Sequence, residues 1–195
     1  HSISAMHSIG EISGKQGELT LLHTLGHIKS KRLIFVGLGK ESDLTLDSIR
    51  KIGGQLARKL RSIGVQKAHT IIPRPSLSQL NIFEVSTSMI EGILLGLYKF
   101  NKHTTKDSID KPNPAEIVFI HDETENSKDL AESIRRGVIT ANATILARDM
   151  VNQPANFMTP SNMADIALEV AKSHSLEIDI LDKEDLIKLH MGGLL

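Results

Sequence analysis

ARDMVNQPANFMTP, residues 147–160, is the stretch around which the chain is organised. A long helical pattern reaches it from upstream, and a second helical pattern begins where it ends. Pro154 and Pro160 each lack the N–H that a helix interior needs, and the residue before a proline avoids helical geometry. The stretch therefore predicts a rigid elbow between two helices, with Thr159 as the N-cap of the second helix and Pro160 at its first position.

The pattern on either side of the elbow is regular. Upstream, apolar residues at mostly helical spacing predict one helix from Ser127 to about Val151. Downstream, after the helix that Thr159 begins, apolar and acidic residues alternate over Leu176–Leu181 and predict a strand. Asp182 then follows as the N-cap of a short helix that runs to Leu189. The last part of the chain thus reads helix, strand, helix.

The first part of the chain alternates between strands and helices. Its strongest strand pattern is Arg32–Val36, which is nearly continuously apolar, as expected of a central strand buried on both faces. Further strands are predicted over Leu19–Thr24, Lys67–Ile72 and Ala115–Ile120, and residues 1–17 are expected to form a loop. Helices are predicted over 45–63 and over 81–100. The first has Thr45 as its N-cap and Gly64 as its stop, and its Gly53-Gly54 is interpreted as allowing close packing of the helix on the sheet. This alternation predicts an α/β three-layer sandwich.

Composition excludes several classes of function. Lys+Arg and Asp+Glu number 23 each among 195 residues, so the net charge is zero and no nucleic-acid or anionic-membrane partner is expected. The sequence contains no cysteine. This rules out disulfides, iron–sulfur clusters, cysteine-bound zinc and a cysteine nucleophile. No apolar run reaches the length of a membrane span, and no signal peptide is recognised. We expect a cytoplasmic protein whose beginning, at His1 rather than Met, has been trimmed.

One predicted loop contains a glycine pattern that can form a phosphate-binding site. Gly37-Leu38-Gly39-Lys40 follows the strand 32–36, and a Gly-x-Gly in that place can cradle a phosphate at a helix N-terminus. No third glycine follows at the dinucleotide spacing, however, and the lysine lacks the context of a P-loop. We interpret the stretch as a tight loop at a strand end.

Two acidic stretches contain residue types that bind metals. The first is interpreted as a solvated run of charge within one short loop, and comprises His121, Asp122, Glu123 and Glu125. In the second, Asp182 is interpreted as an N-cap and the others as first-turn or outward-facing strand residues; it comprises Glu177, Asp179, Asp182, Glu184 and Asp185. Neither the His-Glu-x-x-His nor the Gly-x-Ser-x-Gly motif occurs.

The sequence around the elbow resembles that of the leucyl (cytosol) aminopeptidase family. Members of that family read Ala-Arg-Asp-Leu-Val-Asn-x-Pro-x-Asn, then Thr-Pro, and later an acidic helix ending in Met-Gly. Residues 147–160 and 182–193 match this with conservative departures, and Gly92–Phe100 resembles a helix of the family's N-terminal domain. The resemblance implies a macro-domain-like N-terminal domain with a mixed sheet over residues 1–126, lacking its first strand or two. It further implies a linker helix over 127–151 and the truncated beginning of a second α/β, catalytic domain over 152–195.

The resemblance also implies a function for the parent protein. Family members remove N-terminal amino acids, leucine preferred, from peptides, with two divalent metal ions, manganese or zinc. They assemble as cytoplasmic homohexamers. Their metal ligands lie mainly around an Asn-Thr-Asp-Ala-Glu-Gly-Arg signature that this sequence does not contain. We therefore assign no catalytic, metal or substrate-binding residue within 1–195, and expect this chain alone to be inactive.

Two alternatives stay open at this point. A macro-like domain could bind ADP-ribose or a related nucleotide, with Gly37–Lys40 as the place to look, although fold analogy is weak support for function. The N-terminal domain could instead be a non-catalytic assembly module.

Overall fold

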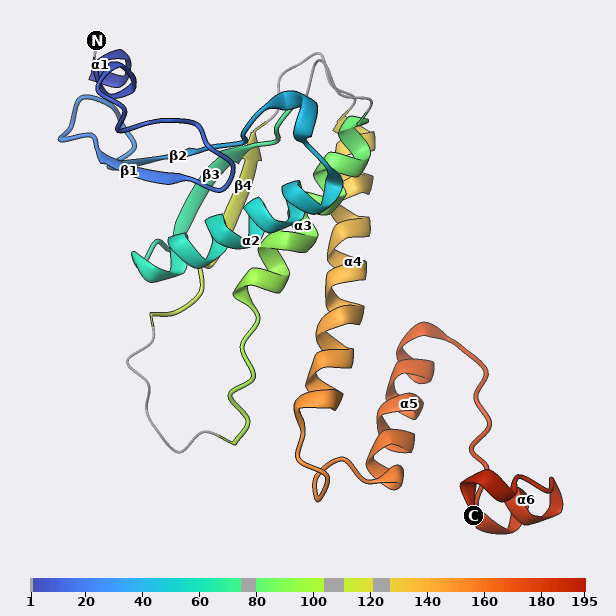
Figure 1. The fold of residues 1–195 in the computed structure, drawn as a ribbon. Coiled ribbons are helices and arrows are strands. Elements are labelled where there is room, and N and C mark those ends of the chain that lie inside the picture. The colour runs from blue at the N-terminus through green and yellow to red at the C-terminus, as the bar shows by residue number, and fades with distance from the viewer. Residues whose placement is uncertain (1, 75–79, 104–110, 121–126) are drawn as a thin grey trace. The chain divides into compact units, whose positions relative to one another are not determined.

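The computed structural model describes residues 2–74, 80–103, 111–120 and 127–195. The chain divides into two compact units, His1–Leu146 and Ala147–Leu195. Each unit is described by itself, and both are drawn in Figure 1. None of the described helices combines the length and the hydropathy that a membrane crossing requires.

The first unit follows the predicted alternation of strands and helices. Its elements are α1 (Ser2–Ser8), β1 (Leu19–His23), β2 (Arg32–Val36), the 3-10 turn η1 (Glu41–Asp43), α2 (Leu46–Ser62), β3 (Lys67–Ile71), α3 (Ile82–Leu97), β4 (Glu116–Ile120) and α4 (Ser127–Asn152), whose last turns belong to the second unit. The α/β class is therefore confirmed. The expected loop over residues 1–17 is wrong for residues 2–8, which form the short helix α1.

Both strand orientations of the predicted mixed sheet occur. β1 pairs with β2 antiparallel, with Leu21 opposite Ile34, and β3 pairs with β4 parallel, with His69 opposite Val118. The hydrogen bonds form two separate two-stranded sheets in the described part of the chain. β2 is accordingly paired on one edge only, and all five of its residues are half-buried. The fully central position that its apolar sequence predicts is thus not realised by these residues.

The core lies between the strands and the two helices α2 and α3. Ile49, Leu56, Val85 and Met89 are buried in it. Apolar residues of α2 and α3, spaced at every three or four positions, belong to this core together with partly buried residues of the strands. As predicted, Thr45 caps α2: its hydroxyl accepts from the Ser48 N–H at 3.1 Å. Gly64 follows the end of the helix at φ +70°, the left-handed conformation expected of a C′ residue.

Glycines set the distance between α2 and α3. A Cβ added at Gly92 of α3 would lie 2.0 Å from the carbonyl oxygen of Arg50 in α2. A Cβ at Gly53 of α2 would lie 2.6 Å from the carbonyl oxygen of Met89 in α3, and one at Gly96 of α3 would lie 2.6 Å from that of Gly54 in α2. The two backbones thus touch closely. The prediction that Gly53-Gly54 allows close packing of the helix on the sheet is wrong, because the backbone that they approach is that of α3.

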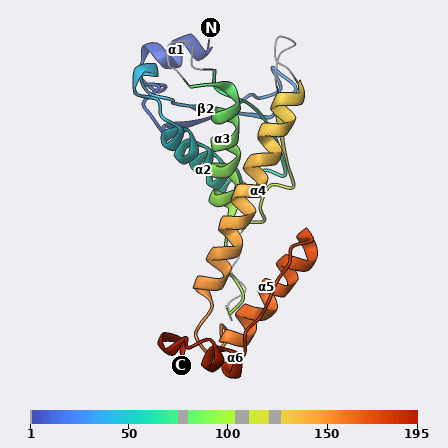
Figure 2. The ribbon, with the colours of Figure 1, turned by 90° about the vertical axis from the view of Figure 1, so that its right-hand side faces the viewer.

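The first part of α4 packs on α3, and the two helices run alongside each other in Figure 2. Gly137 allows this approach, because a Cβ there would lie 2.9 Å from the carbonyl oxygen of Thr87. The Thr87 hydroxyl donates to the backbone carbonyl of Ser133 at 3.3 Å. Ser133 itself is fully buried, with its hydroxyl donating to the Leu130 carbonyl at 2.7 Å. Small and polar side chains therefore allow close contact at this second helix crossing as well.

The second unit is helical. Its complete elements are α5 (Pro160–His174), α6 (Lys183–Lys188) and the 3-10 turn η2 (Gly192–Leu194). The N-caps Thr159 and Asp182 are confirmed, with side-chain oxygens accepting from the Asn162 N–H at 3.3 Å and the Asp185 N–H at 3.0 Å. The predicted strand Leu176–Leu181 is wrong: these residues have no regular secondary structure. Alternation alone cannot form a strand, because a strand's backbone groups must bond to a neighbouring strand, and the described residues supply none.

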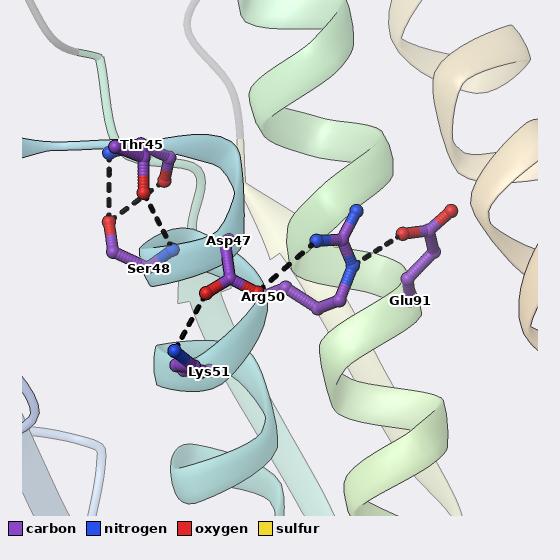
Figure 3. Close-up of polar contacts among 6 residues, drawn as sticks. All are labelled: Thr45, Asp47, Ser48, Arg50, Lys51 and Glu91. Carbon is purple, nitrogen blue, oxygen red and sulfur yellow. Dashed lines mark hydrogen bonds and ion pairs between the residues drawn. The ribbon is translucent and has the colours of Figure 1, made fainter.

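One ion pair joins α2 to α3 beside the glycine contact (Figure 3). The Arg50 guanidinium donates from Nε to the Glu91 carboxylate at 2.8 Å. The Glu91 side chain is 11% exposed, whereas the Arg50 side chain is 37% exposed and also approaches Asp47 at 3.8 Å. The buried carboxylate therefore depends on Arg50 for its partner, while Arg50 retains access to solvent.

We predict that Gly92→Ala destabilises the protein by about 3 kcal/mol, because the new methyl group meets a backbone carbonyl that cannot rotate away. Gly54→Ala is the matched control in the same interface. Its Cβ would lie 3.2 Å from the Gly92 carbonyl oxygen, a small overlap that the better helix propensity of alanine offsets by about 1 kcal/mol. Urea unfolding measures both. Equal losses for the two variants would contradict the proposed role of the glycines.

We predict that Arg50→Ala costs about 2 kcal/mol at neutral pH, because it leaves the Glu91 carboxylate buried without its cation. Lys51→Ala is the control: Lys51 pairs with the exposed Asp47, at 2.7 Å, and a much smaller loss is expected. Adding Glu91→Gln to Arg50→Ala should recover part of the stability, since a neutral amide is easier to bury. The same unfolding measurement tests this, and no recovery in the double variant would contradict it.

Candidate functional site

The loop Gly37–Lys40 is held by the segment that precedes β1. The Gly37 N–H donates to the Glu18 carbonyl at 2.8 Å, and the Gly39 N–H donates to the Gly14 carbonyl at 2.9 Å. A Cβ at Gly37 would lie 2.0 Å from the Lys15 carbonyl oxygen. Both glycine N–H groups that a phosphate would need are thus bound within the protein. The loop closes a strand end, as interpreted from the sequence, and provides no support for a nucleotide site.

A polar hollow of about 300 Å³ opens beside this loop, at the N-terminus of α2. Its walls include Gly17, Asp43, Asp47 and Gln55. The Gln55 Oε1 atom is buried there without a hydrogen-bond partner among the described residues. Gly17 is needed for the close approach, because a Cβ at that position would lie 2.6 Å from the same oxygen.

The side chains at this helix start are already paired with one another (Figure 3). The Ser48 hydroxyl donates to the Thr45 carbonyl at 2.8 Å and accepts from the Thr45 N–H at 3.0 Å. It therefore has no general base to activate it as a nucleophile. The hydrogen bond and charge of Lys51 hold the pKa of the Asp47 carboxyl below its ordinary value. This pair contributes stability at neutral pH that is lost as the pH falls through the lowered pKa. The arrangement caps a helix and has no catalytic constellation.

Two acidic residues of the second unit, Asp182 and Asp185, cap α6. Asp182 accepts from the Asp185 N–H at 3.0 Å, and the Asp185 carboxylate accepts from the Asp182 N–H at 3.4 Å and from Lys188 Nζ at 3.1 Å. Glu177, Asp179 and Glu184 are exposed. Across the described ranges no group of three or more His, Asp or Glu side chains could hold a metal ion. The residues present therefore do not fit the two-metal centre that the resemblance implies.

The other acidic stretch, His121, Asp122, Glu123 and Glu125, lies outside the described residues. The interpretation of that stretch as a solvated run of charge stays a prediction.

The elbow is a geometric device. α4 ends at Asn152, and the Phe157 and Met158 N–H groups both donate to the Pro154 carbonyl, at 2.8 and 3.0 Å. Thr159 then caps α5, which has Pro160 at its first position. The stretch that carries the family resemblance thus forms a turn between helices, as its prolines predict.

Sequence reasoning missed two features. The first is the polar hollow at the start of α2, and the second is the separation of β2 from β3. The signal for the second was present, because the sequence of Arg32–Val36 is typical of a central strand, whereas among the described residues β1 alone is bonded to it. A count of the predicted strands that could pair with each edge of β2 would have shown that one edge lacks an assigned neighbour.

Comparison with known proteins gives the family. A model of the N-terminal domain of the cytosol aminopeptidase family matches residues 1–107, and a model of that family's catalytic domain matches residues 145–195. Among curated relatives, a probable cytosol aminopeptidase of Alkaliphilus oremlandii is 38% identical over 99% of this chain. One of Alkaliphilus metalliredigens is 35% identical over 99% of it. The chain spans only 38% and 39% of the lengths of these two relatives.

Solved structures show the same fold. A tomato leucine aminopeptidase superposes with a TM-score of 0.76 at 25% identity, covering 96% of this chain and 36% of its own. The bottromycin maturation enzyme BotP, solved in complex with Mn, gives a TM-score of 0.78 at 22% identity over 95% of this chain and 37% of its own. The N-terminal model covers more than half of the residues. The chain belongs to the cytosol aminopeptidase family, of which it carries the N-terminal domain and the first part of the catalytic domain.

Proposed function

We propose that these 195 residues are the first part of a metal-dependent leucyl aminopeptidase, which removes N-terminal amino acids from peptides. In this proposal residues 1–126 form the N-terminal domain and residues 127–151 the linker helix. Residues 152–195 begin the catalytic domain. Peptides with an N-terminal leucine are the proposed substrates, and a cytoplasmic homohexamer is the proposed assembly of the full-length protein.

One observation carries this proposal: both domain models of a single family match the chain in order, over residues 1–107 and then over residues 145–195, which begin within the last turns of α4. Relatives named as probable cytosol aminopeptidases align with nearly all of the chain. No feature of the described residues favours ADP-ribose, since the glycine loop that would hold it is bound by residues 14–18.

The proposed metal ions are two divalent cations, Mn²⁺ or Zn²⁺, with ligands outside residues 1–195. The extent of the matches supports this. The catalytic-domain model matches only residues 145–195, and the chain spans 38% of the length of the Alkaliphilus oremlandii relative. Within the second unit, Asp182 and Asp185 are better explained as caps of α6. This chain is therefore proposed to lack activity by itself.

We predict that the full-length protein releases leucine from a leucyl amide, loses this activity on chelation, and regains it with Mn²⁺ or Zn²⁺. Residues 1–195 tested at the same molar concentration, with helix content checked by circular dichroism, should release none. Metal-dependent release by the short chain would show that ligands lie within it. A full-length protein inactive with every divalent metal would refute the aminopeptidase assignment.

A variant inside this chain tests the position of the ligands. In the full-length protein, Asp182→Asn keeps the helix cap, because asparagine caps as well as aspartate, but removes a charge that a metal ligand would need. We predict unchanged metal content and leucine release. Loss of one bound metal ion per chain, with the fold intact, would make Asp182 a ligand instead.

A further inference from the structure

The charges of the first unit are separated along α2. Glu41, Asp43 and Asp47 lie at or just before its first turn, whereas Arg61 lies in its last turn. At roughly 1.5 Å per residue, Asp47 and Arg61 are about 21 Å apart along the helix. That is roughly twice the distance over which salt screens an exposed charge. The acidic end therefore does not neutralise the other end, and the zero net charge of the chain does not exclude an anionic partner there.

Cations from other segments meet at the end of α2. The Arg32 guanidinium, at the start of β2, donates to the Ile63 carbonyl at 3.1 Å, and Lys111 Nζ donates to the Ser62 carbonyl at 3.0 Å. Positive charge is favoured beside the carbonyls of a helix C-terminus. Helix capping thus explains why these two cations gather here. Residues 104–110, whose sequence holds one lysine and two aspartates, lie outside the described residues.

Lysines that capping does not use extend this positive surface. Lys31 and Lys67 border one hollow together with the end of α2, and Lys67 pairs with Glu116 at 2.8 Å. Lys29 and Lys31 are exposed, and neither has a carboxylate partner among the described residues. Residues 19–32 contain three Lys or Arg and no Asp or Glu. We call this surface the basic end, and it comprises Lys29, Lys31, Arg32, Arg61, Lys67 and Lys111.

The loop between β1 and β2 adds an apolar tip to the basic end. In Figure 1 this loop and the end of α2 lie on the same side of the first unit. The Thr24 N–H donates to the Lys31 carbonyl at 3.1 Å, and the Thr24 hydroxyl donates to the Ser30 carbonyl, so the base of the loop is fixed. Leu25 is 87% exposed at the tip, and Ile28 is 49% exposed.

The turn at the tip does not by itself call for a leucine. Leu25 and Gly26 both have positive φ, +49° and +87°, and the His27 N–H donates to the Thr24 carbonyl at 3.0 Å. These are features of a type I′ turn, which prefers asparagine, aspartate or glycine at its first central position. Leucine is uncommon in this backbone conformation. A leucine that is both strained and exposed favours a role in binding.

We propose that the basic end and the loop 24–31 bind the surface of an anionic lipid membrane. Leu25 and Ile28 enter the boundary between headgroups and acyl chains, and Lys29 and Lys31 contact the lipid phosphates beside them. Arg32 and Lys111, held at the end of α2, add to the attraction. This is a contact with one face of a membrane and requires no spanning helix.

The apolar tip distinguishes a membrane from a nucleic acid as the partner. Both are polyanions that attract lysine side chains. Proteins bind the bases of single-stranded nucleic acid largely by stacking aromatic side chains on them, and residues 24–31 contain no Phe, Tyr or Trp. A membrane has an apolar interior behind its phosphates, which suits two aliphatic side chains followed by lysines.

Sedimentation of the full-length protein with lipid vesicles tests the proposal. We expect binding to phosphatidylcholine vesicles that contain about one third phosphatidylglycerol, little binding to phosphatidylcholine alone, and release at high salt. Equal binding to the two compositions, or none to the anionic vesicles at low salt, would overturn the proposal. Amide hydrogen exchange of residues 24–31 should slow when anionic vesicles are added. Amides of Leu25 and Ile28 that are already protected without vesicles would show a covered tip, and would also overturn it.

Leu25→Asn separates the apolar tip from the fold. Asparagine suits the positive φ of this position, so the thermal midpoint should be kept or raised. Affinity for the anionic vesicles should fall about tenfold, because one apolar side chain no longer enters the membrane. Unchanged affinity would refute insertion of the tip. A duplex oligonucleotide that binds more tightly than the vesicles, and equally to both forms of the protein, would identify nucleic acid as the partner and overturn the proposal.

A charge variant tests the lysines in the same assay. Lys29→Gln combined with Lys31→Gln should weaken binding to the anionic vesicles about 30-fold, roughly fivefold per lysine. Lys172→Gln combined with Lys183→Gln is the matched control, because it removes two exposed lysines from the second unit. The control should have a much smaller effect, since the attraction is screened over a short distance. Equal losses would show that total charge controls binding, which would contradict a specific surface.

Discussion

The backbone contact between α2 and α3 is the constraint on which the first unit depends. Gly53, Gly92 and Gly96 remove every side chain from this crossing, so helix backbone meets helix backbone. The closeness has two consequences. It brings Glu91 out of solvent and beside Arg50, which makes the 2.8 Å ion pair part of the same interface. It also lets one apolar face, composed of both helices, cover the strands. A glycine in a helix interior costs about 1 kcal/mol relative to alanine, and here the packing that it permits offsets that cost.

Polar groups in this chain are used mainly to end and begin helices. Thr45, Thr159 and Asp182 each satisfy a first-turn N–H, and the prolines of the elbow stop α4 and start α5. The acidic residues near α6 look like metal ligands in the sequence, yet the oxygens of Asp182 and Asp185 accept from backbone N–H groups and from Lys188. The family membership and the absence of a ligand cluster in the described residues are compatible, because the chain spans less than two fifths of its relatives.

Local chemistry explains what could be predicted. The strands Leu19–His23 and Glu116–Ile120, the stripe of α2 and the caps of three helices follow from residue type and spacing, which act within a few residues. Leu176–Leu181 shows where this reasoning fails. Its alternation is that of a strand, but the described residues contain no partner for it, and the segment stays irregular with Leu176 59% exposed. For the candidate site, the glycine loop was correctly interpreted as a tight turn, whereas the polar hollow beside it depends on residues 16 and 17 reaching α2.

The sequence by itself determined the α/β class, the elbow and the family, because these rest on short-range patterns and on a motif that can be read directly. Tertiary structure decided how the strands group, since hydrogen bonding across a sheet joins residues far apart in the chain. It also decided that Gly37 and Gly39 bind residues 14–18 rather than a ligand, and that Glu91 is a buried partner of Arg50 rather than a surface charge. Each of these features depends on contacts between residues that are far apart in the chain, and a local sequence pattern does not specify such contacts.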